Sequence, residues 1–317
     1  MVSLAVQAMD TLRPVRVTWR EGSSDIGINR RLPTDQGVTM GPNEQGAYHR
    51  QLWVLELAAA EGSARRAIVF SHGCHPVIVY GFAWQSISAD WPGRARRSLS
   101  ETLGEDVHCQ FMQGLAGNIR PRILADLDQH RFRSSRPEDV DAVGQQIATD
   151  VLRTLDQPGQ ELTLNLGAAE HWFLARREPP APIEHWRRLA ESDNDRQREI
   201  GRYWVHRLSD GPPPCRAQPW PVGLIRLDDD HFVAHLPGEP VAEWIDVLRQ
   251  ALPDRRFAAW GYTQHSLGYL PTDALLPEGG YEVAGSSPYL SFGPAPFAPG
   301  LDQAVQTAFQ SLLDRLS

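Results

Sequence analysis

Two histidines and a cysteine stand close together in the stretch "SHGCHPVIVY", directly after the apolar run "AIVF". Metal ligands cluster in this way, and so do polar residues at the ends of buried strands. On an extended strand, His72 and His75 would point to opposite sides because side chains alternate. At most one of them is therefore expected to face a site, unless the strand ends before His75. His75 is either an ordinary hydrogen-bonded residue or a metal ligand.

Glu239, in "HLPGEPVAEW", precedes a predicted helix. A carboxylate in the first helical turn stabilises the helix dipole by about 0.3–1 kcal/mol, which is one explanation of its position. The other explanation is that Pro237 and Gly238 shape a corner that aims the carboxylate into a pocket. The residue types alone leave both explanations open.

Three tyrosines and an arginine fall in segments that read as loops. Tyr262 and Tyr269 lie in "GYTQHSLGYLPT", Tyr281 lies in "EGGYEVAGSS", and Arg30 lies in "GINRR". Loop tyrosines often pack over the edge of a core, but they also donate protons or ligate metals. For Arg30, solvation at the surface is the default expectation.

Motifs of several common enzyme classes are absent from the sequence. It contains no GxSxG, HExxH or paired-carboxylate motif. The turn "QGLAGNIRPR" could bind an anion, but it lacks the lysine and serine or threonine of a P-loop, which argues against a nucleotide site. Ser88 and Asp90 in "SISADWPG" are best explained as the capping segment of a helix.

Composition excludes further classes of protein. The 317 residues carry a formal charge of −8, which argues against a nucleic-acid-binding protein. Three dispersed cysteines form neither a disulfide framework nor a cysteine zinc site. No apolar run approaches the roughly 20 residues of a transmembrane helix, and the first residues do not read as a signal peptide. Localisation and oligomeric state stay open.

Hydrophobic periodicity predicts interleaved helices and strands. Helices are expected at 2–12, 91–104, 137–155, 183–208, 240–252 and 301–317, and strands at 14–22, 49–59, 65–80, 107–114, 162–178 and 256–264, with a hairpin over 219–239. The polar, glycine- and proline-rich segment 28–46 is expected to be irregular. We see no internal repeat and no convincing linker. The predicted architecture is therefore a single α/β domain over 1–317, with a mixed β-sheet that contains hairpins and is covered by helices.

Seven short strings occur in a characteristic order: "INRR", "CHPV", "ISADWPG", "QGLAGNIRPR", "LPGEP", "GYLPT" and "EGGYEVAGSS". Together they resemble the neutral/alkaline non-lysosomal ceramidase family, and most closely its shorter bacterial branch. The resemblance implies a zinc-dependent amidohydrolase that cleaves the amide of an N-acylsphingosine with a water activated by Zn²⁺. It also implies a small-molecule lipid amide as the substrate.

The resemblance assigns a role to each candidate residue. His75, Glu239 and Tyr269 match zinc ligands, whereas Tyr281 and Arg30 match residues that contact the reacting carbonyl. His72 falls where the branch usually has another residue, so it is expected to be structural or to support a ligand.

One feature of the family is not found in the sequence. The family's first zinc histidine lies in an "HTHS"-like segment, and this chain contains no HxH string. The chain is therefore expected to be an N-terminally shortened catalytic domain in which three ligands could still hold zinc. The alternatives are a hydrolase of a smaller, non-lipid amide or ester, and a non-catalytic relative.

Overall fold

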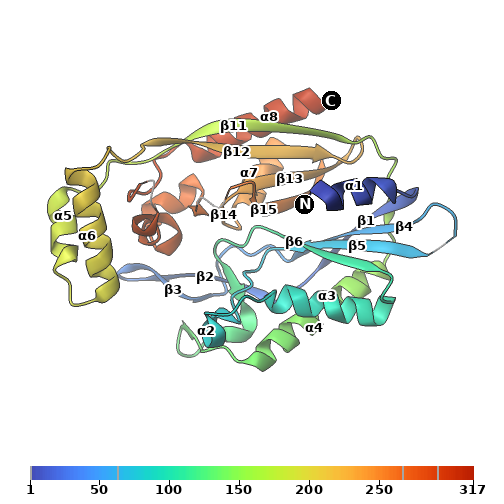
Figure 1. Ribbon diagram of the computed structural model, residues 1–317, viewed down its shortest axis with the longest axis horizontal. Helices are drawn as coiled ribbons and strands as arrows, with labels where there is room; N and C mark the ends of the chain where they lie inside the picture. The colour runs from blue at the N-terminus through green and yellow to red at the C-terminus, as the bar shows by residue number, and fades with distance from the viewer. Residues whose placement is uncertain (1, 63, 266–267, 291–292) are drawn as a thin grey trace.

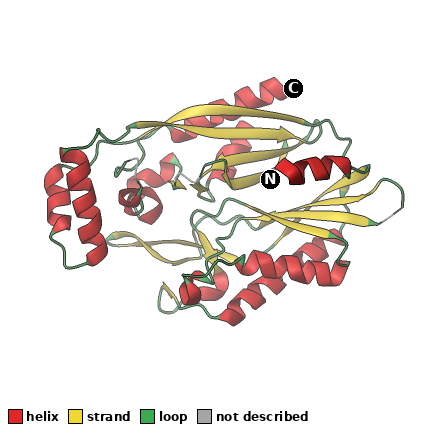
Figure 2. Ribbon diagram, viewed as in Figure 1, coloured by secondary structure: helices red, strands yellow, loops and turns green. Residues whose placement is uncertain are grey.

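The computed structural model describes residues 2–62, 64–265, 268–290 and 293–317. Two β-sheets face each other across the middle of the molecule, and helices cover their outer sides (Figures 1 and 2). The ring of Trp19 in the first sheet lies 5.2 Å from the ring of His231 in the second. Most of the described strands thus belong to two main sheets, and short strands form three smaller ones. The predicted class, a mixed α/β fold with hairpins and covering helices, is confirmed.

The first sheet has the strand order β10-β1-β4-β5-β6. Its strands are β1 (Val15–Ser23), β4 (Gln51–Ala59), β5 (Arg65–His72), β6 (His108–Gln113) and β10 (Gln160–Glu161). All neighbouring pairs are antiparallel except β5 and β6, which are parallel and joined through helix α3 (Asp90–Leu103). Helix α4 (Pro137–Leu155) packs beside α3 on the outer side of this sheet.

The second sheet repeats this plan with the order β11-β12-β13-β15. Its strands are β11 (Gly167–Arg176), β12 (Ala217–Arg226), β13 (His231–Pro237) and β15 (Arg256–Thr263). Strands β13 and β15 are parallel and are joined through helix α7 (Trp244–Ala251), and helix α8 (Leu301–Leu316) packs on β11 and β12. Each sheet therefore contains one parallel pair, and ligands commonly bind at the carboxyl ends of such strands.

Shorter elements connect and flank the sheets. They are α1 (Val2–Asp10), α2 (Tyr80–Ala83), α5 (Ile183–Ala190), α6 (Asp195–Ser209), β2 (Gly27–Thr34), β3 (Gly37–Asn43), β7 (Ile119–Pro121), β8 (Ala125–Asp126), β9 (Arg131–Phe132), β14 (Glu239–Pro240) and β16 (Tyr269–Leu270). Short 3₁₀ helices span Arg122–Leu124, Asp273–Glu278 and Ser287–Tyr289, and a π-helical turn spans Tyr281–Gly285. None of the described helices has the length and apolar character needed to cross a bilayer.

Three sequence predictions about regular structure were wrong. The strand expected over 65–80 ends at His72, because the chain leaves the sheet there and the His75 N–H donates to the Ile119 carbonyl instead, at 3.1 Å. The segment expected to be irregular forms the β2–β3 hairpin, whose arginines are buried by ion pairs and so did not show the apolar pattern of a strand. The helix expected over 183–208 is two helices, because Asn194 starts α6 by accepting a hydrogen bond from the Gln197 backbone N–H at 3.1 Å. The segment "SISADWPG" begins helix α3 at Asp90, but the N-cap residue, Ala89, makes no side-chain cap; Ser88 Oγ accepts from the Asp90 N–H at 3.0 Å, and the Asp90 carboxylate accepts from the Val79 and Trp91 N–H groups at 2.7 Å.

His72 ends strand β5 and is completely buried. Its Nδ1 lies 2.9 Å from the carbonyl oxygen of Gln51, to which it must donate, and its Nε2 lies 2.9 Å from the hydroxyl of Tyr48. Both ring nitrogens are therefore used inside the fold, so His72 has a structural role. Burial lowers the pKa of His72 to about 4.

This depressed pKa makes stability depend on pH. Between about pH 6.5 and pH 4 the unfolded state binds a proton on His72 that the folded state does not, so stability is lost as pH falls through this window. We expect His72 alone to account for about 2.5 kcal/mol of the decline in unfolding free energy between pH 7 and pH 4.5. Urea denaturation of the wild type at pH 7 and at pH 4.5 measures this drop in unfolding free energy. In His72→Gln the drop between the two pH values should be smaller by about the contribution of His72. An equal decline in both proteins would contradict the prediction.

Candidate active site

The five residues assigned from the sequence lie together at the carboxyl ends of the two parallel strand pairs. His75 follows β5, Glu239 forms β14 directly after β13, and Tyr269 lies in β16 beside it. Arg30 comes from β2, and Tyr281 opens the π-helical turn. The rings of His75 and Tyr269 are 6.4 Å apart, those of Tyr269 and Tyr281 are 5.4 Å apart, and the guanidinium carbon of Arg30 lies 5.3 Å from the Tyr269 ring centroid.

His75 and Glu239 face each other with atoms that are both hydrogen-bond acceptors. His75 Nδ1 lies 3.0 Å from the carbonyl oxygen of Ile119 and must carry the ring proton, because a carbonyl cannot donate. In the neutral ring, Nε2 then presents a lone pair to Glu239 Oε2, only 2.9 Å away. Two acceptors at this separation need a proton or a cation between them.

The electrostatics of the pair favour the form without the extra proton. Burial lowers the pKa of His75, and the positive charge of Arg30 lowers it further, although the Glu239 carboxylate opposes both. Burial raises the pKa of Glu239, but His75, Tyr269 and Arg30 outweigh this effect and leave that pKa below its ordinary value. A neutral imidazole beside an ionised carboxylate is the state in which both residues bind metal ions.

The backbone holds Glu239 away from any helix. Helix α7 begins at Trp244, so the carboxylate does not lie in its first turn and the helix-dipole explanation is wrong. Gly238 has a left-handed φ of +65°, and a side chain there would meet the Gly268 carbonyl oxygen at 2.4 Å from its Cβ. The Glu239 N–H donates to that same carbonyl at 2.9 Å, which pairs β14 with β16 and sets Glu239 beside Tyr269.

Arg30 is a buried residue, not the solvated surface residue that was the default expectation. It is 5% exposed, and its Nε donates to Glu282 Oε1 at 2.7 Å. Arg31 binds the other oxygen of the same carboxylate at 2.9 Å. Burial disfavours the charged guanidinium, but Tyr269 and Glu282 outweigh this effect and raise the pKa of Arg30. The Nη2 atom of Arg30 is buried and makes no hydrogen bond to the described residues, so it can donate a hydrogen bond to a bound ligand.

Tyr262 belongs to the site, although the sequence offered it only as one of three loop tyrosines and the resemblance assigned it no role. Its hydroxyl lies 2.8 Å from His75 Nε2 and 3.4 Å from Glu239 Oε2. Burial raises the pKa values of Tyr262, Tyr269 and Tyr281. One sequence signal could have identified Tyr262. It lies at the carboxyl end of a predicted strand, as Glu239 does, and ligands commonly bind at the carboxyl ends of parallel strands.

The turn after β6 ties the two halves of the site together. Asn118 Oδ1 accepts from the Ala242 N–H at 2.8 Å, its side-chain amide donates to Glu243, and its carbonyl accepts from the Arg30 N–H at 2.8 Å. Burial raises the pKa of Glu243 to about 6. A side chain at Gly117 would meet the Glu239 carbonyl oxygen at 2.4 Å, which explains the glycine. The turn "GLAGN" therefore holds the backbone of Arg30 and the segment around Glu239 in place.

Within the described ranges, no three histidine, cysteine, aspartate or glutamate residues cluster closely enough to hold a metal ion. A metal at this site would thus need phenol oxygens in addition to His75 and Glu239. Imidazole, carboxylate and phenol are nitrogen and oxygen donors, which suit zinc. The convergence of the His75 and Glu239 lone pairs fits such an ion.

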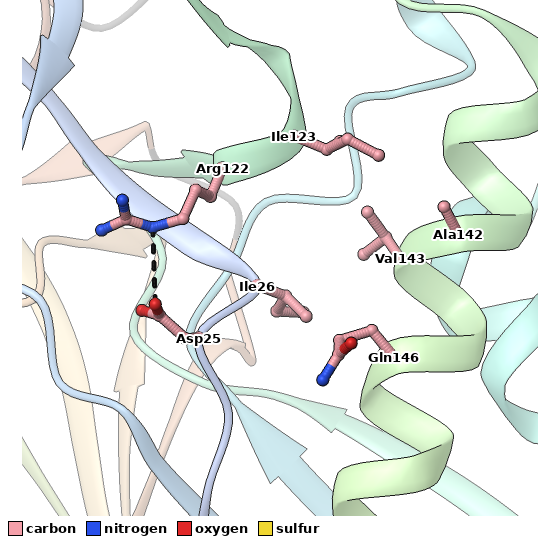
Figure 3. Close-up of a pocket in the computed structure, with 7 residues that line it drawn as sticks. All are labelled: Asp25, Ile26, Arg122, Ile123, Ala142, Val143 and Gln146. Atoms are coloured by element: carbon pink, nitrogen blue, oxygen red, sulfur yellow. Dashed lines mark ion pairs between the residues drawn. The ribbon is translucent and has the colours of Figure 1, made fainter. Parts of the chain in front are cut away.

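A separate surface pocket of about 470 Å³ lies between β2 and α4 (Figure 3). Its lining residues are Asp25, Ile26, Arg122, Ile123, Ala142, Val143 and Gln146. The charged members, Arg122 and Asp25, approach to 3.7 Å. None of the five assigned residues lines this pocket, and it offers no nucleophile or metal-binding pair, so we do not place the chemistry there.

Comparison with known proteins rests on structure. The sequence matches no protein-family model and no curated protein. The fold is similar to that of the neutral ceramidase from Pseudomonas aeruginosa, with a TM-score of 0.68, 16% identity, and coverage of 99% of this chain and 55% of the other. It is also similar to a ceramidase solved in complex with C2, with a TM-score of 0.67, 15% identity, and coverage of 98% and 55%. This chain thus spans about half the length of these neighbours, and its fold is that of the neutral ceramidases.

Proposed function

We propose that this chain is a zinc-dependent hydrolase of a linear amide, and that the amide is that of an N-acylsphingosine or a related lipid. The observation that carries the proposal is the pair of acceptor atoms, His75 Nε2 and Glu239 Oε2, held 2.9 Å apart beside the guanidinium of Arg30. The fold shared with ceramidases supports the same reaction class.

In this proposal His75, Glu239 and Tyr269 would hold the zinc ion. The bound ion supplies a water activated for attack at neutral pH. The Ile119 carbonyl keeps the His75 proton on Nδ1, so Nε2 stays free as a donor of electrons to the metal. Tyr269 lies beside Glu239 in the β14–β16 pair, which places its phenol next to the carboxylate.

Arg30 and Tyr281 would bind the oxygen of the reacting carbonyl. Glu282 fixes the Arg30 guanidinium through Nε and leaves Nη2 without a partner among the described residues. Tyr281 packs against the Tyr269 ring and is 37% exposed, so a substrate could reach this residue from solvent. Such preorganised donors stabilise the negative charge that develops on the carbonyl oxygen.

Glu239→Gln should weaken zinc binding by at least about 10–100-fold, because a neutral amide oxygen replaces an anionic ligand. Isothermal titration with zinc measures the affinity, and release of fatty acid from an N-acylsphingosine should fall in parallel. Glu44→Gln, a half-exposed carboxylate paired with Arg122, is the matched control and should behave as the wild type. Unchanged zinc affinity in Glu239→Gln would rule out Glu239 as a ligand.

Tyr281→Phe should lower kcat by about 10²–10³-fold while leaving zinc affinity unchanged, because it removes a donor to the oxyanion and no ligand. Steady-state kinetics on an N-acylsphingosine test this prediction, with the half-exposed Tyr289→Phe as control. A loss of zinc in Tyr281→Phe, or a kcat equal to that of the wild type, would contradict the role.

The same assay separates the alternative functions. Short-chain N-acyl amines and esters are offered beside the N-acylsphingosine. Faster turnover of the short substrates would move the assignment to a smaller amide or ester, and zinc binding without turnover of any substrate would favour a non-catalytic relative.

A further inference from the structure

We propose that Tyr262 is a direct ligand of the metal, and that its phenol oxygen supplies a fourth protein donor beside His75, Glu239 and Tyr269. This inference rests on the proposed zinc site. It starts from two distances, since the Tyr262 hydroxyl lies 2.8 Å from His75 Nε2 and 3.4 Å from Glu239 Oε2, which are themselves 2.9 Å apart.

The three atoms form a triangle of the size that a zinc ion requires. Zinc bonds to nitrogen and oxygen are about 2.0–2.1 Å long, so neighbouring donors around a tetrahedral ion are about 3.3 Å apart. The observed separations of 2.8, 2.9 and 3.4 Å lie close to this value. The donors therefore need only small adjustments to enclose an ion.

When His75 is neutral, hydrogen bonding among these three residues cannot satisfy all of them. Tyr262 has one proton, which it can give either to His75 Nε2 or to Glu239 Oε2. Whichever of these two atoms receives the Tyr262 proton, the other acceptor still faces only lone pairs. The proton of the His75 ring cannot help, because it is on Nδ1 and donates to the Ile119 carbonyl. A cation among the three residues is attracted to all of these lone pairs at once.

The backbone around Tyr262 is distorted in a way that delivers its side chain to the site. Tyr262 has a left-handed φ of +59°, which is unusual for a bulky residue and costs on the order of 1–3 kcal/mol. The parallel register of β13 and β15 shifts here, from His235 opposite Trp260 to Pro237 opposite Thr263. A bulge of this kind redirects a side chain, and the Tyr262 N–H secures it by donating to the Gly238 carbonyl at 2.9 Å.

The test compares metal binding by the wild type, Tyr262→Phe and Tyr281→Phe. Zinc affinity is measured by isothermal titration, and the ligand set is followed by the visible absorption bands of Co²⁺ bound in place of zinc. These bands respond to a change of coordinating atom. Phe keeps the ring and its packing, so metal-free Tyr262→Phe should melt close to the wild type. Tyr281→Phe is the matched control, because Tyr281 belongs to the same cluster of rings but is not assigned as a ligand.

We expect Tyr262→Phe to weaken zinc binding by at least about 10–100-fold and to change the Co²⁺ bands, while Tyr281→Phe changes neither. Weaker zinc binding with unchanged Co²⁺ bands would show that Tyr262 only positions His75 and would overturn the inference. Wild-type affinity in Tyr262→Phe would overturn it as well. If the wild type itself binds no zinc, the proposed function fails first, and the ligand assignment fails with it.

Discussion

The site depends on one constraint, the hydrogen bond from His75 Nδ1 to the carbonyl of Ile119. This bond fixes the tautomer of the ring and turns the lone pair of Nε2 toward Glu239. Burial and the charge of Arg30 then keep the imidazole neutral. Without this bond the imidazole could turn and share a proton with the carboxylate, and the pair would be an ordinary buried interaction. With it, the two residues turn lone pairs toward each other 2.9 Å apart, which is the arrangement that the proposed zinc site needs.

The two parallel strand pairs explain how distant residues meet. One helical crossover leads from β5 through α3 to β6, and the other leads from β13 through α7 to β15. The ends of these strands and the segments after them carry His75, Asn118, Glu239 and Tyr262 to the same edge. Asn118 bonds to both the Arg30 backbone and the segment after Glu239, so a shift of one half would move the other.

Much of the fold could be predicted from sequence, because long elements with clear periodicity, such as α4 and α8, depend on local patterns. The β2–β3 hairpin could not, since Arg30 and Arg31 are buried by Glu282, about 250 residues away. The five assigned residues came from a resemblance to known motifs, and their proximity agrees with it. Tyr262 received no role because, although it lies at the end of a predicted strand, the direction of its side chain depends on a bulge and a left-handed φ that no sequence pattern indicates.

The most direct test of the central claim is a crystal structure of the protein with zinc, with anomalous diffraction data collected at the zinc absorption edge. The account predicts one strong anomalous peak about 2.0–2.2 Å from both His75 Nε2 and Glu239 Oε2. A peak at another site, or a structure without bound zinc in which His75 and Glu239 share a proton, would contradict it.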